Sequence, residues 1–318
     1  MNTTGFIRLC QPNKDDLYHW LESELKAVYG DNMVAKNGYI FCKGSNSPVG
    51  LSAHIDTVFK QSPITINEND GIISSPQGIG GDDRCGIYGV LDILTYMQKK
   101  GQFPFVFLST DEEVGGATTK RMANDCAKMV DGLQFILALD RAGSVDSVYY
   151  ECDNRDFKTW IDSFGFKEAK GTRTDICTLC DVWDVAGVNF SVGYYKNHTK
   201  DEYVILNQLE ATLEKCHKIV DAADPKQRFP FCRTTTFHGG YYRGSNFLAE
   251  MFIKGDKVFT KQYETRGYTN PRVSGGGVVT IPPYTPLEVL DVDGSFCKVT
   301  YNNITAWVSS YNLLMDVS

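Results

Sequence analysis

The stretch that decides the fold is residues 48–56, PVGLSAHID, where an apolar run ends in a histidine and an aspartate. We predict a buried strand over Pro48–Ala53, and similar apolar runs occur at Phe103–Ser109, Phe135–Leu139 and Val188–Val192. A strand that stays hydrophobic throughout is typical of a parallel sheet with helices on both faces. The sequence therefore predicts an α/β fold with a mixed, mostly parallel central sheet flanked by helices.

Three segments show the spacing of amphipathic helices. Apolar residues recur every three or four positions in Asp15–Tyr29, Arg84–Lys100 and Asn207–Ala222. We expect these helices to cover the sheet. Asp83 stands just before the second of them, where a carboxylate can accept hydrogen bonds from free backbone N–H groups.

Metal-binding side chains follow the predicted strands. The segments that carry them are LSAHIDTVF, GIGGDDRCG, STDEEVGG, FILALDRAG and YYKNHTKDEY. In open α/β sheets, ligands bind in the crevice outside the carboxyl ends of the strands, so donors from distant segments meet there. Oxygen and nitrogen donors of these types suit a pair of divalent cations about 3.5–4 Å apart. The candidate metal ligands are His54, Asp82, Glu113, Asp140 and His198.

Acidic neighbours of these ligands have distinct expected roles. His54 and Asp56 are two residues apart, so on an extended strand they project from the same face, and Asp56 can accept the second imidazole N–H. Glu112 and Glu113 are adjacent and would point in opposite directions on a strand. We assign Glu113 to metal binding and Glu112 to proton transfer.

The motifs occur in an order that resembles one known superfamily. His-x-Asp is followed by Gly-x-Gly-x-Asp-Asp-Arg, Asp-Glu-Glu-x-Gly, a strand ending in Asp, and Asn-His-Thr-x-x-Glu. This order is similar to the co-catalytic zinc exopeptidases, which include peptidase T, carboxypeptidase-like enzymes and zinc aminopeptidases. The similarity extends from about Pro12 to Ala223. It implies the zinc-exopeptidase type of α/β fold, also found in phosphorylase-like proteins.

The resemblance also implies a reaction. Two divalent ions, Zn²⁺ in preference to Co²⁺ or Mn²⁺, would be bridged by Asp82 and would activate a water molecule. Glu112 would act as the general base and Asp56 would support the catalytic site. The expected substrate is a short peptide, cleaved by an exopeptidase of the aminopeptidase, carboxypeptidase or dipeptidase type.

One part of the superfamily pattern is absent from the sequence. Only about thirty residues separate Asp140 from Thr174, where peptidase T and the carboxypeptidases carry an inserted lid or dimerisation domain. The lid supplies an oxyanion-binding histidine in those relatives, so another donor is needed here. Arg141, Tyr194 and Tyr195 are the candidate substrate-binding residues.

Composition restricts the partners. The chain has 318 residues, a net charge of −7 and 42% hydrophobic residues, which suits a large core and argues against nonspecific binding to nucleic acid. We find no signal peptide and no apolar run long enough to span a membrane. We therefore predict a cytoplasmic protein whose ten cysteines are mostly reduced, with Cys177 and Cys180 in the core.

The character of the chain changes after Ala223. We predict three parts: a catalytic domain without an inserted lid over residues 1–223, a linker over 224–250, and a small all-β domain over 251–318. The last part has short β-type runs separated by turn signals such as Asn302-Asn303. It resembles the bacterial SH3-like barrel, a domain that often accompanies peptidoglycan-active enzymes. A cell-wall ligand is one expectation for it, and a packing or dimerisation role is the other.

Three functions remain open from the sequence. The first is the metal-dependent exopeptidase. The second is a hydrolase of N-acyl amino acids or of amides derived from peptidoglycan, with the same metals. The third is a noncatalytic binding protein on the same fold, which the presence of Glu112 disfavours.

Overall fold

The chain folds into two compact units. In a computed structural model, we describe residues 3–171, 173–233, 254–261, 264–269, 278–293, 296–309 and 312–315. One unit comprises residues 1–180 and 185–234, and the other comprises residues 181–184 and 235–318. We describe each unit by itself.

The first unit is built on an eight-stranded sheet in the order β1-β2-β6-β3-β7-β10-β8-β9. Its four central strands are parallel, while β2 pairs antiparallel with β6 and β8 pairs antiparallel with β10. The predicted mixed, mostly parallel sheet is therefore confirmed. The strands are β1 (Met33–Lys36), β2 (Tyr39–Cys42), β3 (Val49–His54), β6 (Phe105–Ser109), β7 (Phe135–Arg141), β8 (Asp146–Val148), β9 (Lys167–Glu168) and β10 (Ala186–Ser191).

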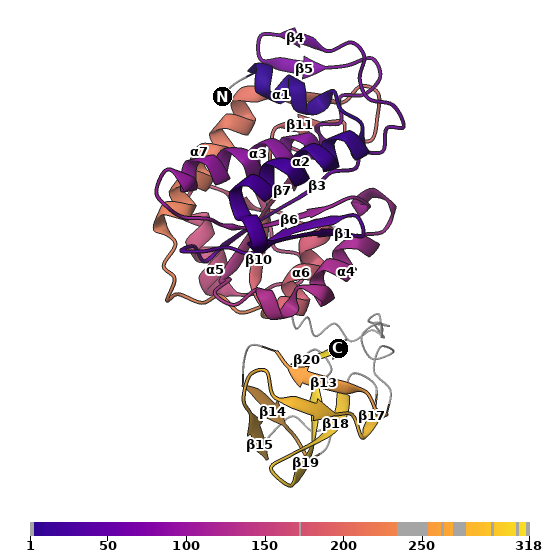
Figure 1. Cartoon of the computed structure of the whole chain (residues 1–318). Helices are drawn as coiled ribbons and strands as arrows, with labels where there is room; N and C mark the ends of the chain where they lie inside the picture. Colours follow the sequence, from indigo (N-terminus) through magenta and orange to yellow (C-terminus); the bar gives the residue numbers. More distant parts are fainter. Residues whose placement is uncertain are drawn as a thin grey trace, which may run out of the picture. The chain divides into compact units, whose positions relative to one another are not determined.

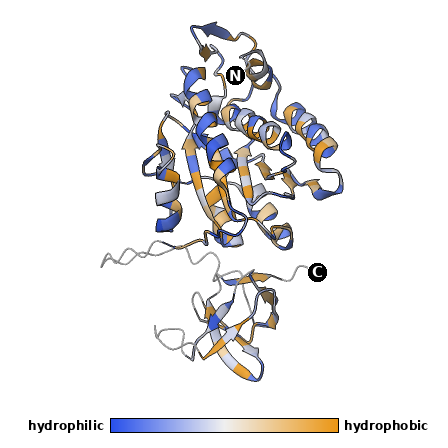
Figure 2. Ribbon diagram, turned by 90° about the vertical axis from the view of Figure 1, so that its left-hand side faces the viewer, coloured by the Kyte–Doolittle hydropathy of each residue, from blue (hydrophilic) through white to orange (hydrophobic). Residues whose placement is uncertain are grey.

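Helices cover both faces of this sheet (Figure 1). One layer contains α1 (Thr3–Cys10), α2 (Lys14–Tyr29), α3 (Gly81–Gln98) and α7 (Leu206–Ala222). The opposite layer contains α4 (Ala117–Asp125), α5 (Arg155–Asp162) and α6 (Asp175–Trp183). Hydrophobic residues run along the central strands, whereas the helices alternate between hydrophobic and hydrophilic residues (Figure 2).

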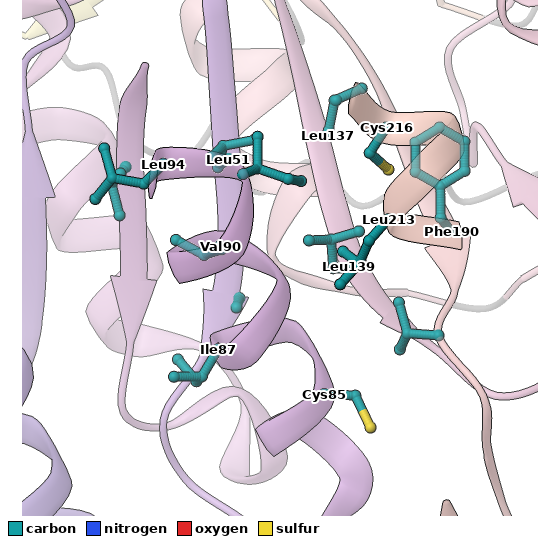
Figure 3. Close-up of a cluster of buried hydrophobic side chains, with 14 of the residues drawn as sticks. Leu51, Cys85, Ile87, Val90, Leu94, Leu137, Leu139, Phe190, Leu213 and Cys216 are labelled. Atoms are coloured by element: carbon teal, nitrogen blue, oxygen red, sulfur yellow. The ribbon is translucent and has the colours of Figure 1, made fainter. Parts of the chain in front are cut away.

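The core between α3 and the sheet fixes the position of the helix that follows Asp82. Ile87, Val90 and Leu94 of α3 lie over the strands that carry Leu51 and Leu139 (Figure 3). All five side chains are at most 3% exposed. Each such side chain stabilises the fold by about 1.5–3 kcal/mol relative to leaving it in water. The N-terminal end of α3 is thereby held at the carboxyl edge of the sheet.

The sequence predicted the long elements and missed the short ones. The four predicted strands correspond to β3, β6, β7 and β10, and the three predicted helices to α2, α3 and α7. A second sheet with the order β11-β12-β5-β4 was not predicted. Its strands contain only two or three residues, too few to show a hydrophobic period. They are β4 (Asn67–Asn69), β5 (Ile72–Ser74), β11 (Tyr194–Tyr195) and β12 (Tyr203–Ile205).

The described part of the second unit consists of short antiparallel strands. They form the groups β16-β13-β20, β14-β15 and β17-β18-β19 around a small apolar core. Asn302 and Asn303 both have positive φ angles, as a tight hairpin turn requires, so the predicted turn between β18 and β19 is confirmed. The strands are β13 (Lys257–Thr260), β14 (Thr265–Gly267), β15 (Val279–Ile281), β16 (Pro286–Glu288), β17 (Asp291–Asp293), β18 (Phe296–Tyr301), β19 (Ile304–Ser309) and β20 (Leu313–Met315).

The start of the predicted linker differs from the expectation. Phe229 is 2% exposed and stacks on Trp160 of α5 with 5.3 Å between ring centroids. Its carbonyl oxygen accepts a hydrogen bond from the backbone N–H of Ala186. Burial of this aromatic ring attaches residues 224–233 to the first unit. Residues 234–250 lie outside the described part of the chain.

Two further features bear on the predictions from composition. Among the described helices, none combines the length and the apolar composition of a membrane span. All ten cysteines are free thiols, with Cys180 buried and Cys177 partly exposed.

Candidate metal centre

The five predicted ligands meet at the carboxyl edge of the central sheet. His54 is the last residue of β3, and Asp140 is the last residue but one of β7. Glu113 follows β6 in a 3-10 turn over Glu112–Val114, and Asp82 lies in the first turn of α3. His198 lies in the loop between β11 and β12. The parallel strands place their ends together, as the sequence predicted.

The five side chains form two groups that share Asp82. We call His54, Asp82 and Asp140 the buried half, and Asp82, Glu113 and His198 the exposed half. In the buried half, His54 Nε2 lies 3.0 Å from Asp82 Oδ1 and 3.6 Å from Asp140 Oδ1. In the exposed half, His198 Nε2 lies 3.1 Å from Asp82 Oδ2 and 3.2 Å from Glu113 Oε1. The two oxygens of Asp82 therefore serve different halves.

The hydrogen bonds of His54 leave one ring nitrogen facing carboxylates. Its Nδ1 lies 3.0 Å from the Asp56 carbonyl oxygen, which can only accept, so Nδ1 carries the proton of the neutral ring. The lone pair on Nε2 then points at Asp82 and Asp140. Only a cation, either a proton or a metal ion, makes that arrangement favourable, and one proton on Nε2 can be directed at only one of the two carboxylates.

The distances between the donors fit metal ligation. Zinc bonds of about 2.0–2.1 Å in tetrahedral geometry place two ligand atoms roughly 3.3–3.4 Å apart. The four nitrogen–oxygen distances given above are 3.0, 3.6, 3.1 and 3.2 Å. Glu113 Oε1 is also buried without a hydrogen-bond partner among the described residues. The donor set and its spacing therefore suit divalent metal.

Crowding of acids is visible in the pKa values. Burial raises the pKa of Glu113 to about 7 and that of Glu112 to about 8, and neighbouring carboxylates add to both shifts. Burial and the negative charge of Asp140 raise the pKa of Asp83 well above its usual value. Bound cations would offset the repulsion between these carboxylates, because cations favour the ionised form.

Three residues hold Asp140 in place. The Thr174 hydroxyl donates to Asp140 Oδ2 at 2.8 Å, and the Tyr194 hydroxyl donates to Asp140 Oδ1 at 3.2 Å. Asn189 on the neighbouring strand accepts from the Asp140 N–H at 2.8 Å and donates to its carbonyl oxygen at 2.6 Å. Groups of this kind orient metal ligands and increase their affinity.

Asp56 connects the two halves. One carboxylate oxygen lies 3.4 Å from His54 Nδ1, in addition to the backbone contact already described. The same carboxylate accepts the backbone N–H groups of Glu112 and Glu113, each at 3.2 Å. Asp56 therefore contacts the His54 imidazole, more closely through its backbone carbonyl than through the predicted carboxylate, and also fixes the turn that carries both glutamates.

The reason given from the sequence for separating Glu112 and Glu113 is wrong. Both residues belong to a 3-10 turn, so strand alternation does not set their directions. Their surroundings still differ: Glu113 contacts His198, whereas Glu112 makes no side-chain hydrogen bond or ion pair with any residue that the structure describes. The two glutamates therefore remain distinct candidates for metal binding and for proton transfer.

Glu202 is a site residue that the sequence interpretation missed. Its carboxylate is 0% exposed and accepts the N–H groups of Gly80 at 2.8 Å and Asp82 at 3.0 Å. Burial raises the pKa of Glu202 to about 7. Asn197 also donates to Asp82 Oδ2 at 2.9 Å. Both residues belong to the quoted Asn-His-Thr-x-x-Glu motif, so the signal was present but only His198 was used.

The three predicted substrate-binding residues are engaged within the protein. Tyr194 is 2% exposed and donates to Asp140, a position that orients a metal ligand and leaves its hydroxyl unavailable to substrate. The Tyr195 hydroxyl donates to Gln208 at 2.5 Å. Arg141 pairs with Asp146 at 3.0 Å. Contact of Arg141 and Tyr195 with substrate stays a prediction.

Known proteins share the two parts of this architecture. Residues 268–313 match the family described as the bacterial SH3 domain. No curated protein matches the chain in sequence. The aminopeptidase PepT from Bacillus cereus has a similar structure, with a TM-score of 0.51 and 13% identity over 69% of this chain and 96% of that chain.

Two other peptidase structures have comparable similarity. A tripeptidase from Staphylococcus aureus gives a TM-score of 0.52 at 13% identity, over 68% of this chain and 95% of its own. An aminopeptidase from the archaeon Desulfurococcus kamchatkensis gives 0.50 at 15% identity, over 70% of this chain and 96% of its own. The first unit thus has the fold of these peptidases, as the motifs led us to expect, and residues 268–313 match the bacterial SH3 domain.

Proposed function

We propose that the first unit is a metal-dependent hydrolase that cleaves amide bonds of short peptides as an exopeptidase. The observation that carries the proposal is the position of Asp82, whose two oxygens face the imidazoles of His54 and His198 at 3.0 and 3.1 Å. A carboxylate shared in this way suits two neighbouring divalent ions. Zinc fits imidazole and carboxylate donors best, while cobalt and manganese are alternatives.

The residues of the chain then have separate tasks. Two bound ions would acidify a water molecule and polarise the scissile carbonyl group. Glu112 takes the proton of the attacking water and passes it to the leaving amine, because its carboxylate is beside the ligands and engaged with none of them. Asp56 and Glu202 hold the backbone of the ligand-bearing turns.

Replacing Glu112 by Gln tests this assignment. We expect metal content to be retained and kcat to fall by about 10²–10⁴-fold, since proton transfer contributes that much in typical enzymes. Metal analysis should accompany an assay with free, N-blocked and C-blocked peptides, which also separates aminopeptidase from carboxypeptidase action. Unchanged turnover in the variant would refute the role of Glu112.

The bacterial SH3 domain favours a second candidate function. Residues 268–313 match this domain, which often accompanies peptidoglycan-active enzymes, so the second candidate is hydrolysis of amides derived from peptidoglycan by the first unit, with a cell-wall ligand as partner of the second unit. The same screen extended to N-acyl amino acids and wall-derived peptides decides between the two substrate classes. A binding protein without catalysis would hydrolyse none of them.

The limits of the domains and the cellular location of the protein are further proposals. We propose a catalytic domain over residues 1–223, against which residues 224–233 pack through Phe229, and a C-terminal domain over residues 251–318. Expression of residues 1–233 alone tests whether the first part folds and binds metal independently. A cytoplasmic location rests on the sequence and is tested by fractionation of cells.

A further inference from the structure

A large cavity opens beside the exposed half of the metal centre. Its volume is about 790 Å³, within the range of about 300–1,000 Å³ typical of ligand pockets. Glu113 and Asp56 belong to its lining, so the cavity is continuous with the ligand-bearing turn. The other walls come from residues 10, 12–16, 57–63 and 78–80 and from Arg84, Thr110 and Val114. A substrate whose amide lies at the metal centre has room for a neighbouring side chain in this cavity.

Apolar side chains line the cavity although part of their surface faces water. Val58 is 40% exposed and Val114 is 84% exposed, and both belong to the lining. Ile64, which follows the lining residue Pro63, is 86% exposed. These are three of the six large hydrophobic residues exposed in the described part of the first unit, the others being Trp20, Ile72 and Val145. Apolar surface gathered at one site often marks a binding surface.

Local contacts fix the loop that forms one wall. The ring of Phe59 lies against Gly78, where an added Cβ atom would be 2.3 Å from the ring. Gln77 Oε1 accepts the N–H groups of Ile64 and Thr65 at 3.2 and 3.3 Å. The wall is therefore formed before any ligand arrives, which reduces the entropy lost on binding.

The charges in the lining do not favour a charged ligand. The lining holds charges of both signs: Lys14, Lys60 and Arg84 are basic, and Asp15, Asp16, Asp56 and Glu113 are acidic. A charged side chain would meet both signs, whereas an apolar side chain gains from contact with Val58, Phe59 and Val114. The cavity therefore suits an apolar group.

We propose that this cavity is the subsite that binds an apolar side chain of the substrate next to the scissile amide. The inference rests on the proposed function, because it takes the metal centre as the place of cleavage. It assigns substrate preference to the loop after β3 and to the turn after β6, two segments that no sequence motif had connected with specificity.

A pair of metal-chelating probes tests the subsite without turnover. Acetohydroxamate and 4-methylpentanohydroxamate share the chelating group and differ in the apolar chain. With the zinc-loaded full-length protein, we expect the longer probe to bind at least about tenfold more tightly by calorimetry, the smaller end of what burying such a group contributes. The double variant Val58→Ser, Val114→Ser should lower this ratio of affinities by about threefold or more.

Controls distinguish a failure of the proposed subsite from a failure of the proposed function. Ile304→Ser, at a position 41% exposed in the second unit, should leave the ratio unchanged. The cleavage rates of Leu-Gly-Gly, Gly-Gly-Leu and Gly-Gly-Gly are measured in parallel. Suppose that the protein binds metal and cleaves peptides. If the two hydroxamates then bind equally, or if the double variant keeps the wild-type ratio of affinities, the subsite is refuted while the proposed function stands. If no metal binds, the proposed function fails and the subsite fails with it.

Discussion

The two halves of the candidate metal centre hold their side chains in different ways. The His54 side chain is 2% exposed, whereas the His198 side chain is 49% exposed. His54 and Asp140 belong to neighbouring parallel strands, while Glu113 and His198 belong to a turn and a loop. The positions of His54 and Asp140 are therefore set by sheet register, whereas the turn that carries Glu113 is held by the hydrogen bonds that it donates to Asp56. Backbone pairing supplies rigidity in one half that side chains must supply in the other.

The largest expected effect comes from the ligand that both halves share. Asp82→Asn removes the charge that faces both imidazoles, so we expect metal content to fall in both halves and kcat/KM to drop on the order of 10⁴-fold. Metal analysis and peptide hydrolysis measure the two effects. Asp131→Asn, at an exposed position before β7, is the matched control. Retention of both ions by Asp82→Asn would show that the halves do not share this residue.

In the metal-free protein, substitution of His54 and of His198 should change stability by different amounts. In His54→Ala, the buried carbonyl of Asp56 loses its donor, so we expect the free energy of unfolding to fall by about 1–3 kcal/mol. His198→Ala changes a half-exposed residue and should stay within about 0.5 kcal/mol. Denaturant unfolding in the presence of a chelator measures both values. Equal losses would contradict the difference between a buried and an exposed half.

Glu202 tests how far the shared residue Asp82 depends on the hydrogen bonds that support its backbone. Glu202→Gln replaces one of two accepting oxygens by an NH₂ group, which cannot accept from Gly80 or Asp82. We expect metal affinity to fall by about 10–100-fold, the usual effect of losing a group that orients a ligand. Competition with a chromogenic chelator measures the affinity. Glu214→Gln, at an exposed position of α7, should bind metal like the wild type.

The smallest effect is expected where support is redundant. Thr174→Val removes one hydrogen bond to Asp140, but Tyr194 and Asn189 keep theirs. We expect metal affinity to fall by at most about tenfold, at the low end for such supporting groups. The same chelator assay compares it with Thr178→Val, a control on α6. A loss as large as that of Glu202→Gln would mean that the support of Asp140 is not redundant.

The buried half was the more predictable from sequence for a physical reason. An apolar run of five or six residues ending in His54 or Asp140 indicates a parallel strand, and parallel strands bring their carboxyl ends to one edge. No such rule applies to His198, which stands in the loop after a two-residue strand. Its assignment depended on the resemblance of the Asn-His-Thr segment to a known superfamily.

Supporting residues were hardest to predict. Asn189 lies 49 residues from the group it binds, and nothing in its local sequence distinguishes it from other polar residues. Glu202 lies 120 residues from Asp82, and although it belongs to the Asn-His-Thr-x-x-Glu motif, the motif does not indicate which backbone groups it binds. The packing of Phe229 was missed in the same way, because a Pro- and charge-rich neighbourhood resembles a linker until its aromatic partners are known. A local sequence pattern does not indicate which distant residues will be in contact.

By itself the sequence determined the class of fold and the order of the central elements, because hydrophobic period is a local property, and it supplied the candidate metal-binding side chains. Only the tertiary structure decided that Asp82 divides its two oxygens between His54 and His198. It also decided that Tyr194 faces Asp140 and that a cavity opens beside Glu113. These are relations between segments that are far apart in the chain, and they arise only when the helices and strands pack together.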